Sequence, residues 1–361
     1  MVFETSITKM FGIKHPIVGA PMGPWTTDSI AIGLCEAGGL GIVSHIGMIK
    51  TWEEFEEFSK DLSNLGKIDN LAAMQESLIH VAEHTDKPFG FNIRTSRNET
   101  DAGKLARELP KFIMENPKLK DQVLYALTSA GSPRILPQSK SFQRLREVSE
   151  IKLFHVAPAL WLADKCVASG VDGLVCTGGE GGGHQSYEQV STLVLLQQIR
   201  QKYPDVPLLA CGGFASGEGL AAVLAMGGGG IVMGTQFISS KECEFHDNWK
   251  NVIPPAKAGD TKLVTGRLGP IRLWKNKYCI SHDLVSSKED LVKYEEERTP
   301  EAFMEELKHY MAVYKGDVEN TAILMGQSAG IINSIESIRD IVKRIVNDAE
   351  KCLKNAYATI K

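Results

Sequence analysis

A glycine-rich loop that ends in histidine is the segment of this sequence best suited to chemistry. It runs from Thr177 to His184 and directly follows a short apolar run. Glycines let a backbone approach a ligand closely, and an imidazole that titrates near neutral pH can accept or donate a proton. We therefore expect His184 to be catalytic, and we expect the loop to contact a bound cofactor through Gly179, Glu180, Gly182 and Gly183. The alternative is a flexible loop whose histidine faces solvent.

Two further glycine turns follow neighbouring apolar runs of the chain. Gly212 and Gly213 follow the run 206–211, and Gly234 and Thr235 follow the run 229–233. Paired turns after the last two strands of a β/α barrel form a phosphate cradle, because backbone N–H groups reach an anion only where no Cβ intervenes. These turns predict a phosphate-bearing cofactor. The alternative is that they serve only the close packing of helices on strands.

A third group of residues could lie against a flat ring. A methionine thioether packs well on aromatic faces, and the side-chain amide of Asn92 can donate and accept hydrogen bonds at a ring edge. Asn92 ends one apolar run, and the first run ends in Ala20, Pro21, Met22 and Gly23. A plain strand-ending turn is the alternative for each motif.

Four other side chains have open interpretations. His155 is either a second polar wall of the site or a core histidine, and Arg272 either steers an anionic substrate or forms a surface ion pair. Cys176 and Cys211 each end an apolar run and could lie near the cofactor. A buried structural cysteine is the more common case.

The elements that must position these residues alternate between two kinds. Short apolar runs bounded by Gly or Pro predict strands, and the longer amphipathic stretches between them predict helices. The expected strands are 15–22, 40–44, 88–93, 122–128, 151–156, 171–176, 206–211 and 229–233, and an unusually long helical region is expected over 51–85. This order predicts an α/β fold, a (β/α)₈ TIM barrel. A doubly wound sheet is disfavoured because no G-x-G-x-x-G follows the first strand.

The pattern changes beyond residue 240. Residues 241–319 are charged and lack period-2 runs, so we expect a smaller, mostly helical appendage that partly covers the barrel mouth. Residues 1–240 together with 320–361 would form the barrel. The last helix carries isoleucine and valine on one face, which predicts that it packs on the barrel wall.

Composition narrows the class of protein. The chain has 361 residues, a net charge of −4 and no basic stripe, so nucleic acid is not an expected partner. Its seven cysteines are scattered without a C-x-x-C pair, which favours a reducing compartment, here the cytoplasm, over a disulfide framework or a metal site. No secretory signal is visible. Four consecutive glycines interrupt the uncharged stretch 219–240, so no membrane span is expected.

Taken in order, these motifs resemble the nitronate monooxygenase (2-nitropropane dioxygenase) family, which is related to FMN-dependent enoyl-ACP reductases. The motifs are Ala20 to Gly23, Phe91-Asn92, Glu180 to His184, Gly212-Gly213, Met233 to Phe237 and Gly326 to Gly330. The resemblance implies a TIM barrel that binds FMN without a covalent link. It places Ala20, Pro21, Met22 and Asn92 at the flavin ring, Gly212, Gly213, Gly234 and Thr235 at the phosphate, and Gln327 near the flavin.

Within that resemblance His184 matches the family's catalytic histidine, and the expected activity is oxidation of nitronates or nitroalkanes with O₂. The loop departs from the family pattern in two ways: Gly181 replaces an alanine, and Gln185-Ser186 follow the histidine. The second change puts the identity of the small-molecule substrate in doubt.

Two other functions stay open. An enoyl-ACP or other enoyl thioester reductase, or an NADH:quinone reductase, would use NAD(P)H as co-substrate on the same flavin. A barrel that binds a phosphometabolite without flavin is the third possibility. A homodimer is compatible with all of them.

Overall fold

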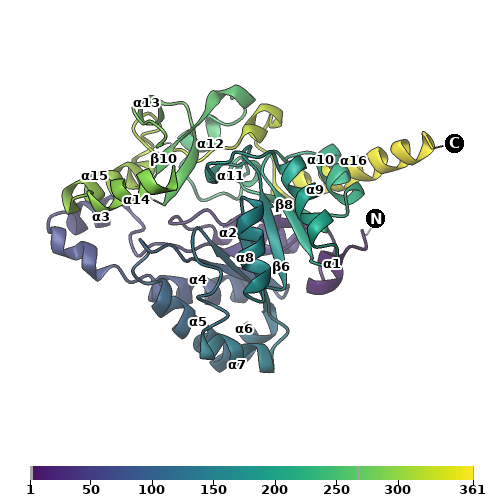
Figure 1. The fold of residues 1–361 in the computed structure, drawn as a ribbon, viewed down its shortest axis with the longest axis horizontal. Helices are drawn as coiled ribbons and strands as arrows, with labels where there is room; N and C mark the ends of the chain where they lie inside the picture. The colour runs from purple at the N-terminus through teal and green to yellow at the C-terminus, as the bar shows by residue number, and fades with distance from the viewer. Residues whose placement is uncertain (1–2, 267, 286, 361) are drawn as a thin grey trace.

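The computed structural model describes residues 3–266, 268–285 and 287–360, and its centre is an eight-stranded parallel sheet (Figure 1). The order in the sheet is β1-β9-β8-β6-β5-β4-β3-β2. The strands are β1 (Ile17–Gly19), β2 (Gly41–Val43), β3 (Phe89–Arg94), β4 (Val123–Ser129), β5 (Lys152–Ala157), β6 (Gly173–Thr177), β8 (Leu208–Cys211) and β9 (Gly230–Met233). All eight fall within or at the edge of the expected runs.

The two ends of this sheet meet and close it into a barrel. The amide of Gly19 donates to the carbonyl of Leu40 at 3.0 Å, and the amide of Leu40 donates to the carbonyl of Ile17 at 2.9 Å. These bonds join β1 to the residue that precedes β2. The TIM-barrel expectation is thereby confirmed.

Helices surround the barrel in the order that the sequence predicts. They are α2 (Asp28–Glu36), α4 (Leu71–His84), α5 (Ala102–Glu115), α6 (Pro117–Gln122), α7 (Lys140–Val148), α8 (Leu160–Ala168), α9 (Thr192–Lys202), α10 (Gly217–Ala225) and α16 (Ile338–Ala358). The buried face of α16 includes Ile341, Val342 and Ile345, and this helix packs on α10 and α2 as expected. Its last turns extend beyond the barrel (Figure 1).

The region 51–85 is helical as expected, but it is not one continuous helix. The region divides into α3 (Trp52–Phe58), the 3₁₀ helix η1 (Leu62–Lys67) and α4. The side chain of Asp61 accepts a hydrogen bond from the amide of Ser63 at 2.9 Å, so the chain restarts after α3 rather than continuing it.

The N-terminal end of the barrel is plugged by α1 (Ser6–Phe11). The Phe11 ring lies 5.3 Å from the Tyr125 ring and 5.8 Å from the Phe154 ring, measured between centroids. All three side chains belong to the apolar cluster that fills the barrel interior. The opposite, C-terminal end is therefore the end where a ligand cavity can open.

Residues 241–319 contain the expected helices and also a β-hairpin that the sequence analysis missed. The segment comprises α12 (Asp247–Asn251), η2 (Ala258–Asp260), the strands β10 (Thr261–Gly266) and β11 (Gly269–Trp274), α13 (Lys277–Ile280), α14 (Lys288–Glu296), α15 (Pro300–Met311) and η3 (Ala312–Lys315). The strand β11 is buried on both faces along most of its length, so it shows no period-2 pattern.

The hairpin attaches this segment to the barrel. The strand β11 pairs with the two-residue strand β7 (Gly183–His184), which lies in the loop after β6. The Trp25 ring from the loop after β1 packs on the rings of Trp249 and Tyr310, both from the segment. The division into a barrel and an appendage stays a prediction. Among the described residues, no helix has the length and apolar character needed to cross a membrane.

Candidate active site

A cavity of about 1050 Å³ opens at the C-terminal ends of the barrel strands. Ligand pockets typically enclose about 300–1,000 Å³, so this one has room for a large cofactor together with a substrate. Most residues predicted for the site line it: Ala20, Pro21, Met22, Gly23, Asn92, Gly182, Gly183, His184, Gly212, Gly213, Gly234 and Thr235. Most of the residues that the sequence groups into one site thus lie around one cavity.

The two glycine turns lie side by side because β8 and β9 are paired neighbours, with Cys211 opposite Val232. Gly212 has φ of 95°, and a Cβ built on it would lie 2.8 Å from the amide nitrogen of Gly181. A side chain there would be strained and would also collide with backbone. The turns thus expose main-chain atoms to the cavity, as an anion cradle requires.

The loop after β1 reaches the same place from the other side. The amide of Ala20 donates to the carbonyl of Met233 at 2.9 Å, and the amide of Met22 donates to Ser44 Oγ at 2.8 Å. A Cβ built on Gly234 would lie 3.4 Å from Ala20 Cβ and 3.6 Å from Met22 Sδ. The expected ring-binding loop and the expected phosphate turns are therefore in contact.

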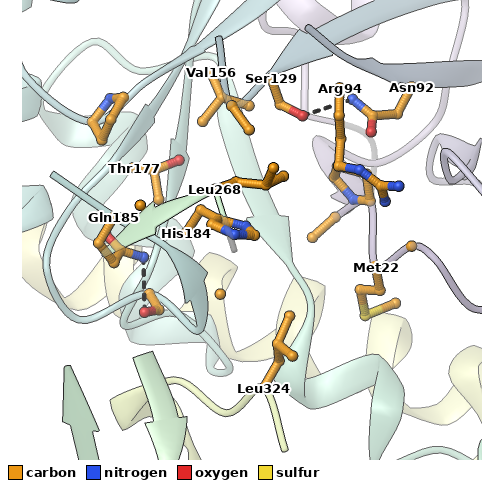
Figure 2. Close-up of a pocket in the computed structure, with 18 of the residues that line it drawn as sticks. Met22, Asn92, Arg94, Ser129, Val156, Thr177, His184, Gln185, Leu268 and Leu324 are labelled. Atoms are coloured by element: carbon orange, nitrogen blue, oxygen red, sulfur yellow. Dashed lines mark hydrogen bonds between the residues drawn. The ribbon is translucent and has the colours of Figure 1, made fainter. Parts of the chain in front are cut away.

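Asn92 lies on β3 with its side-chain amide held in place. Its Nδ2 donates to the carbonyl of Leu127 at 3.0 Å and to Ser129 Oγ at 3.1 Å (Figure 2). The side chain is buried and lines the cavity. Both donors of the amide point to β4, so the carbonyl oxygen is the group that Asn92 can offer to a ligand.

His184 is positioned by strand pairing rather than by a flexible loop. It pairs with Ile271 of β11, and the amide of Gln185 donates to the carbonyl of Pro270 at 2.7 Å. Gln185 Nε2 donates back to the carbonyl of Gly181 at 2.8 Å, as the dashed line in Figure 2 shows. The figure places the His184 ring beside Leu268 at the cavity. The hairpin thus holds the imidazole at the barrel mouth.

Gly179, Glu180 and Gln327 do not line the cavity, although the sequence analysis grouped them with the cofactor site. A Glu180 carboxylate oxygen accepts from the amide of Thr192 at 2.9 Å and from its hydroxyl at 3.1 Å. The amide of Gln327 donates to the carbonyl of Glu180 at 2.8 Å. These residues support the glycine loop from behind.

Arg272 braces the same loop. Its Nε donates to the carbonyl of Gly179 at 2.8 Å, and its Nη1 donates to Thr261 Oγ1 at 3.1 Å. The side chain is only 8% exposed and does not line the cavity. Neither expectation for Arg272 holds: it is neither a surface ion pair nor a wall of the substrate site.

His155 is a core histidine. It is fully buried, its Nδ1 lies 2.7 Å from Thr128 Oγ1, and it is absent from the cavity lining. Desolvation lowers the pKa of its imidazole to about 3. The ring is therefore neutral in the folded protein at physiological pH.

This burial predicts a loss of stability in mild acid. The unfolded chain binds a proton at His155 below about pH 6.5 whereas the folded chain does not, so the free energy of unfolding falls as pH falls from 6.5 toward 3. Between pH 6.5 and pH 5 we expect His155 to contribute a loss of about 1.5 kcal/mol. Urea titrations at both pH values should show a smaller loss in His155→Gln than in the wild type. His84→Gln, a change at an exposed histidine, is the control and should lose as much unfolding free energy between the two pH values as the wild type. If His155→Gln also loses as much as the wild type, the burial of His155 is not responsible for the loss.

Cys176 and Cys211 differ in their position relative to the cavity, but both thiols are protonated. Cys211 lines the cavity and Cys176 does not. Burial raises the pKa of the Cys211 thiol to about 11 and that of Cys176 to about 12. Both are neutral thiols near pH 7 rather than nucleophilic thiolates.

Four further residues line the cavity: Arg94, Ser129, Thr177 and Gln185. The last two belong to or follow the glycine loop that the sequence singles out, whereas Arg94 and Ser129 were not predicted. Arg94 could have been predicted from the sequence. It lies two residues after Asn92 on the same strand, and alternate residues of a strand share a face. A strand end that places Asn92 in a site must place Arg94 beside it.

Comparisons with known proteins agree with this geometry. A family model described as nitronate monooxygenase matches residues 4–348. A probable nitronate monooxygenase of Staphylococcus saprophyticus is 26% identical over 375 residues, which cover 95% of this chain and 98% of that protein.

Two other curated relatives are more similar over a shorter stretch. A (3aS,4S,5R,7aS)-5-hydroxy-7a-methyl-1-oxo-octahydro-1H-indene-4-carboxyl-CoA dehydrogenase of Rhodococcus jostii is 31% identical over 248 residues, and that of Mycobacterium tuberculosis is 30% identical over 267 residues. The matches cover 69% and 73% of this chain but only 59% and 64% of the relatives. This chain therefore matches less than two thirds of their length.

Solved structures with the same fold cover nearly the whole chain. FabK from Thermotoga maritima has a TM-score of 0.75 at 28% identity, covering 99% of this chain and 100% of that chain. A nitroalkane oxidase from Streptomyces ansochromogenes has a TM-score of 0.69 at 21% identity, covering 97% of this chain and 99% of that chain, a likeness that shows the fold alone.

Proposed function

The chain belongs to the nitronate monooxygenase family, and from this premise we propose that it is an FMN-dependent oxidoreductase that oxidises alkyl nitronates. Dioxygen would be the co-substrate, and a carbonyl compound and nitrite would be the products. One observation carries the proposal: the glycine turns, the loop after β1 and His184 all line one cavity.

The residues that line the cavity suit both ends of FMN, its phosphate and its flavin ring. The turns at Gly212-Gly213 and at Gly234-Thr235 would offer main-chain N–H groups to the phosphate, and a Cβ on Gly212 would collide with the backbone of Gly181 and displace its turn. The Thr235 hydroxyl accepts from the amide of Gly326 at 3.0 Å, so its own proton is left to donate.

The ring would lie against the loop after β1. Met22 supplies a polarisable thioether for an aromatic face, and the free carbonyl oxygen of Asn92 can accept from an N–H at the ring edge. Leu127, Val156, Val175 and Val232 make the cavity floor apolar. Bound FMN would supply the electron transfer, while the protein supplies position and charge.

His184 is the residue we propose to handle the proton. Its ring would take the proton from the carbon next to a nitro group, or hydrogen-bond to the nitronate oxygen if the substrate arrives already deprotonated. The β7–β11 pairing fixes the backbone of His184, so the imidazole is held at one place in the cavity. Gly182 and Gly183 beside it let the substrate approach closely.

A second candidate is an oxidoreductase that acts on a thioester and uses NAD(P)H. The cavity volume of about 1050 Å³ lies at the upper end of the usual range for ligand pockets, and Arg134 and Lys165 line the cavity wall. Both side chains are exposed, and Lys165 Nζ lies 4.8 Å from the centroid of the Trp161 ring. Such cations suit the phosphates of a carrier group, and two relatives are named for a carboxyl-CoA substrate.

One experiment separates these functions. The absorbance spectrum of the purified protein is recorded with and without added FMN, and the yellow protein is then titrated anaerobically with NADH, NADPH and a panel of alkyl nitronates. Bleaching by nitronates alone supports the first proposal, and rapid bleaching by NADH or NADPH supports the second. Failure to take up FMN contradicts both and favours a barrel that binds a phosphometabolite without flavin.

A further inference from the structure

A buried arginine at the cavity has no part in the proposed function so far. Arg94 is the last residue of β3, is 8% exposed and lines the cavity. Figure 2 shows its guanidinium between Asn92 and Met22. A charge buried to this degree is costly unless the protein pairs and orients it.

Two contacts fix the guanidinium. Its Nε donates to Glu99 Oε1 at 2.8 Å, and its Nη1 donates to the carbonyl of His45 at 3.0 Å. Glu99 is itself buried, with 8% exposure. The head group is therefore held on two sides and cannot swing out toward solvent without breaking both bonds.

A buried histidine holds the backbone of the same residue. The amide of Arg94 donates to His45 Nδ1 at 3.0 Å, so this nitrogen carries no proton. His45 is fully buried, and desolvation lowers the pKa of its imidazole. The neutral ring thus carries its proton on Nε2, which lies 3.6 Å from Asp101 Oδ1. His45 orients Arg94 through both its ring and its carbonyl, and the other side of the ring faces Asp101 and Asn70.

The loop after β1 closes on this head group. A Cβ built on Gly23 would lie 2.1 Å from the His45 carbonyl oxygen and 2.7 Å from Arg94 Nη1. Only glycine lets the loop pack this closely. The guanidinium is therefore adjacent to the loop that we place at the flavin ring, which is the reacting part of the cavity.

One donor group of Arg94 is left over. Nη2 has no hydrogen-bond acceptor among the residues that the structure describes, and the side chain faces the cavity. A guanidinium presents its nitrogens in a plane that matches two oxygen atoms of a planar anion. The O–N–O group of a nitronate has this shape and this charge.

We propose that Arg94 binds the nitronate group and stabilises its negative charge, whether the nitronate enters the site as such or forms there when a nitroalkane loses its proton. This inference rests on the proposed function and assigns the charge recognition within it. Glu99 and His45 are positioning residues that hold Arg94 in place. His184 keeps the separate role of proton transfer or of hydrogen bonding to the nitronate.

The test uses propionate as an unreactive planar anion and propionamide as its neutral counterpart. Each is titrated into the FMN-loaded protein, and binding is followed by the perturbation of the flavin spectrum and by calorimetry. We expect the wild type to bind propionate more tightly than propionamide. Because one charge-assisted contact is lost, Arg94→Met/Glu99→Gln should bind propionate about 10- to 100-fold more weakly, with propionamide binding unchanged.

The variants are chosen so that misfolding does not obscure the result. The double variant avoids leaving Glu99 as a lone buried carboxylate, and Arg94→Lys keeps the charge and should retain part of the preference for propionate. Arg107→Met is the matched control, because Arg107 is an exposed arginine on α5 that pairs with Glu108.

The outcomes separate this inference from the proposed function. A wild type that takes up no FMN contradicts the proposed function itself. Unchanged propionate binding in a yellow double variant overturns the inference alone. So does a double variant whose only defect is weaker FMN binding or a shifted flavin reduction potential, because Arg94 would then serve the flavin rather than the substrate.

Discussion

Replacing Gly212 with alanine is expected to yield a folded protein with little or no bound flavin. The residue has φ of 95°, where an alanine is strained, and the new Cβ would lie 2.8 Å from the amide nitrogen of Gly181. The turn must move, and its main-chain atoms would no longer face the phosphate together with Gly234. We expect FMN affinity to fall by at least about 100-fold, since several hydrogen bonds to one charged group are lost at once.

The matched control is Gly170→Ala. Gly170 also has a positive φ, 76°, but a Cβ there meets nothing within 4 Å, and the residue does not line the cavity. Its alanine variant should be less stable by about 1 kcal/mol and should bind FMN as the wild type does. Equal FMN affinities in wild type and Gly212→Ala, measured by fluorescence quenching, would place the phosphate elsewhere.

Replacing His184 with alanine is expected to abolish most turnover while leaving the flavin in place. The change removes the imidazole, but the main-chain pairing of residue 184 with Ile271 can persist. Loss of a positioned acid–base group typically lowers the rate by about 10²- to 10⁴-fold. We expect kcat/KM for a neutral nitroalkane to fall within this range.

The comparison of two substrates sharpens this test. A preformed nitronate needs no proton removed, so His184→Ala should lose much less activity on the nitronate than on the parent nitroalkane. Free imidazole should restore part of the nitroalkane activity. Undiminished turnover of both substrates, at full FMN content, would remove His184 from the mechanism.

The barrel was predictable because its strands are short, buried and bounded by Gly or Pro. β8 and β9 each read as one apolar run, and both are followed by the glycine turns that mark the site. Closure between β1 and Leu40 follows once eight such strands alternate with helices. Local composition therefore determined both the fold class and the end of the barrel that carries the cavity.

The hairpin was not predictable by the same means. The strands β10 and β11 contain Lys262 and Arg272, whose charges interrupt the apolar pattern. Arg272 is tolerated inside because the carbonyl of Gly179 and the hydroxyl of Thr261 accept its hydrogen bonds. Gly179 lies 93 residues away from Arg272 in the chain, so no local sequence pattern reveals this hydrogen bond.

The glycine loop shows where sequence reasoning about a site stops. Composition identifies the whole segment, but it does not say which residues face the cavity. Gly182 and His184 face it, whereas Gly179 and Glu180 face Arg272 and Thr192 behind it. Arg94 shows the converse, because period 2 from Asn92 was sufficient to find it.

The phosphate site is tested most simply by comparing the affinities of the apoprotein for FMN and for riboflavin. The two differ only in the phosphate, which the account assigns to the turns at Gly212-Gly213 and Gly234-Thr235. We predict that the protein binds FMN at least about 100-fold more tightly than riboflavin, as expected when several main-chain amides grip one dianion. Equal affinities for the two ligands, or no binding of either, would show that the two glycine turns do not bind a flavin phosphate.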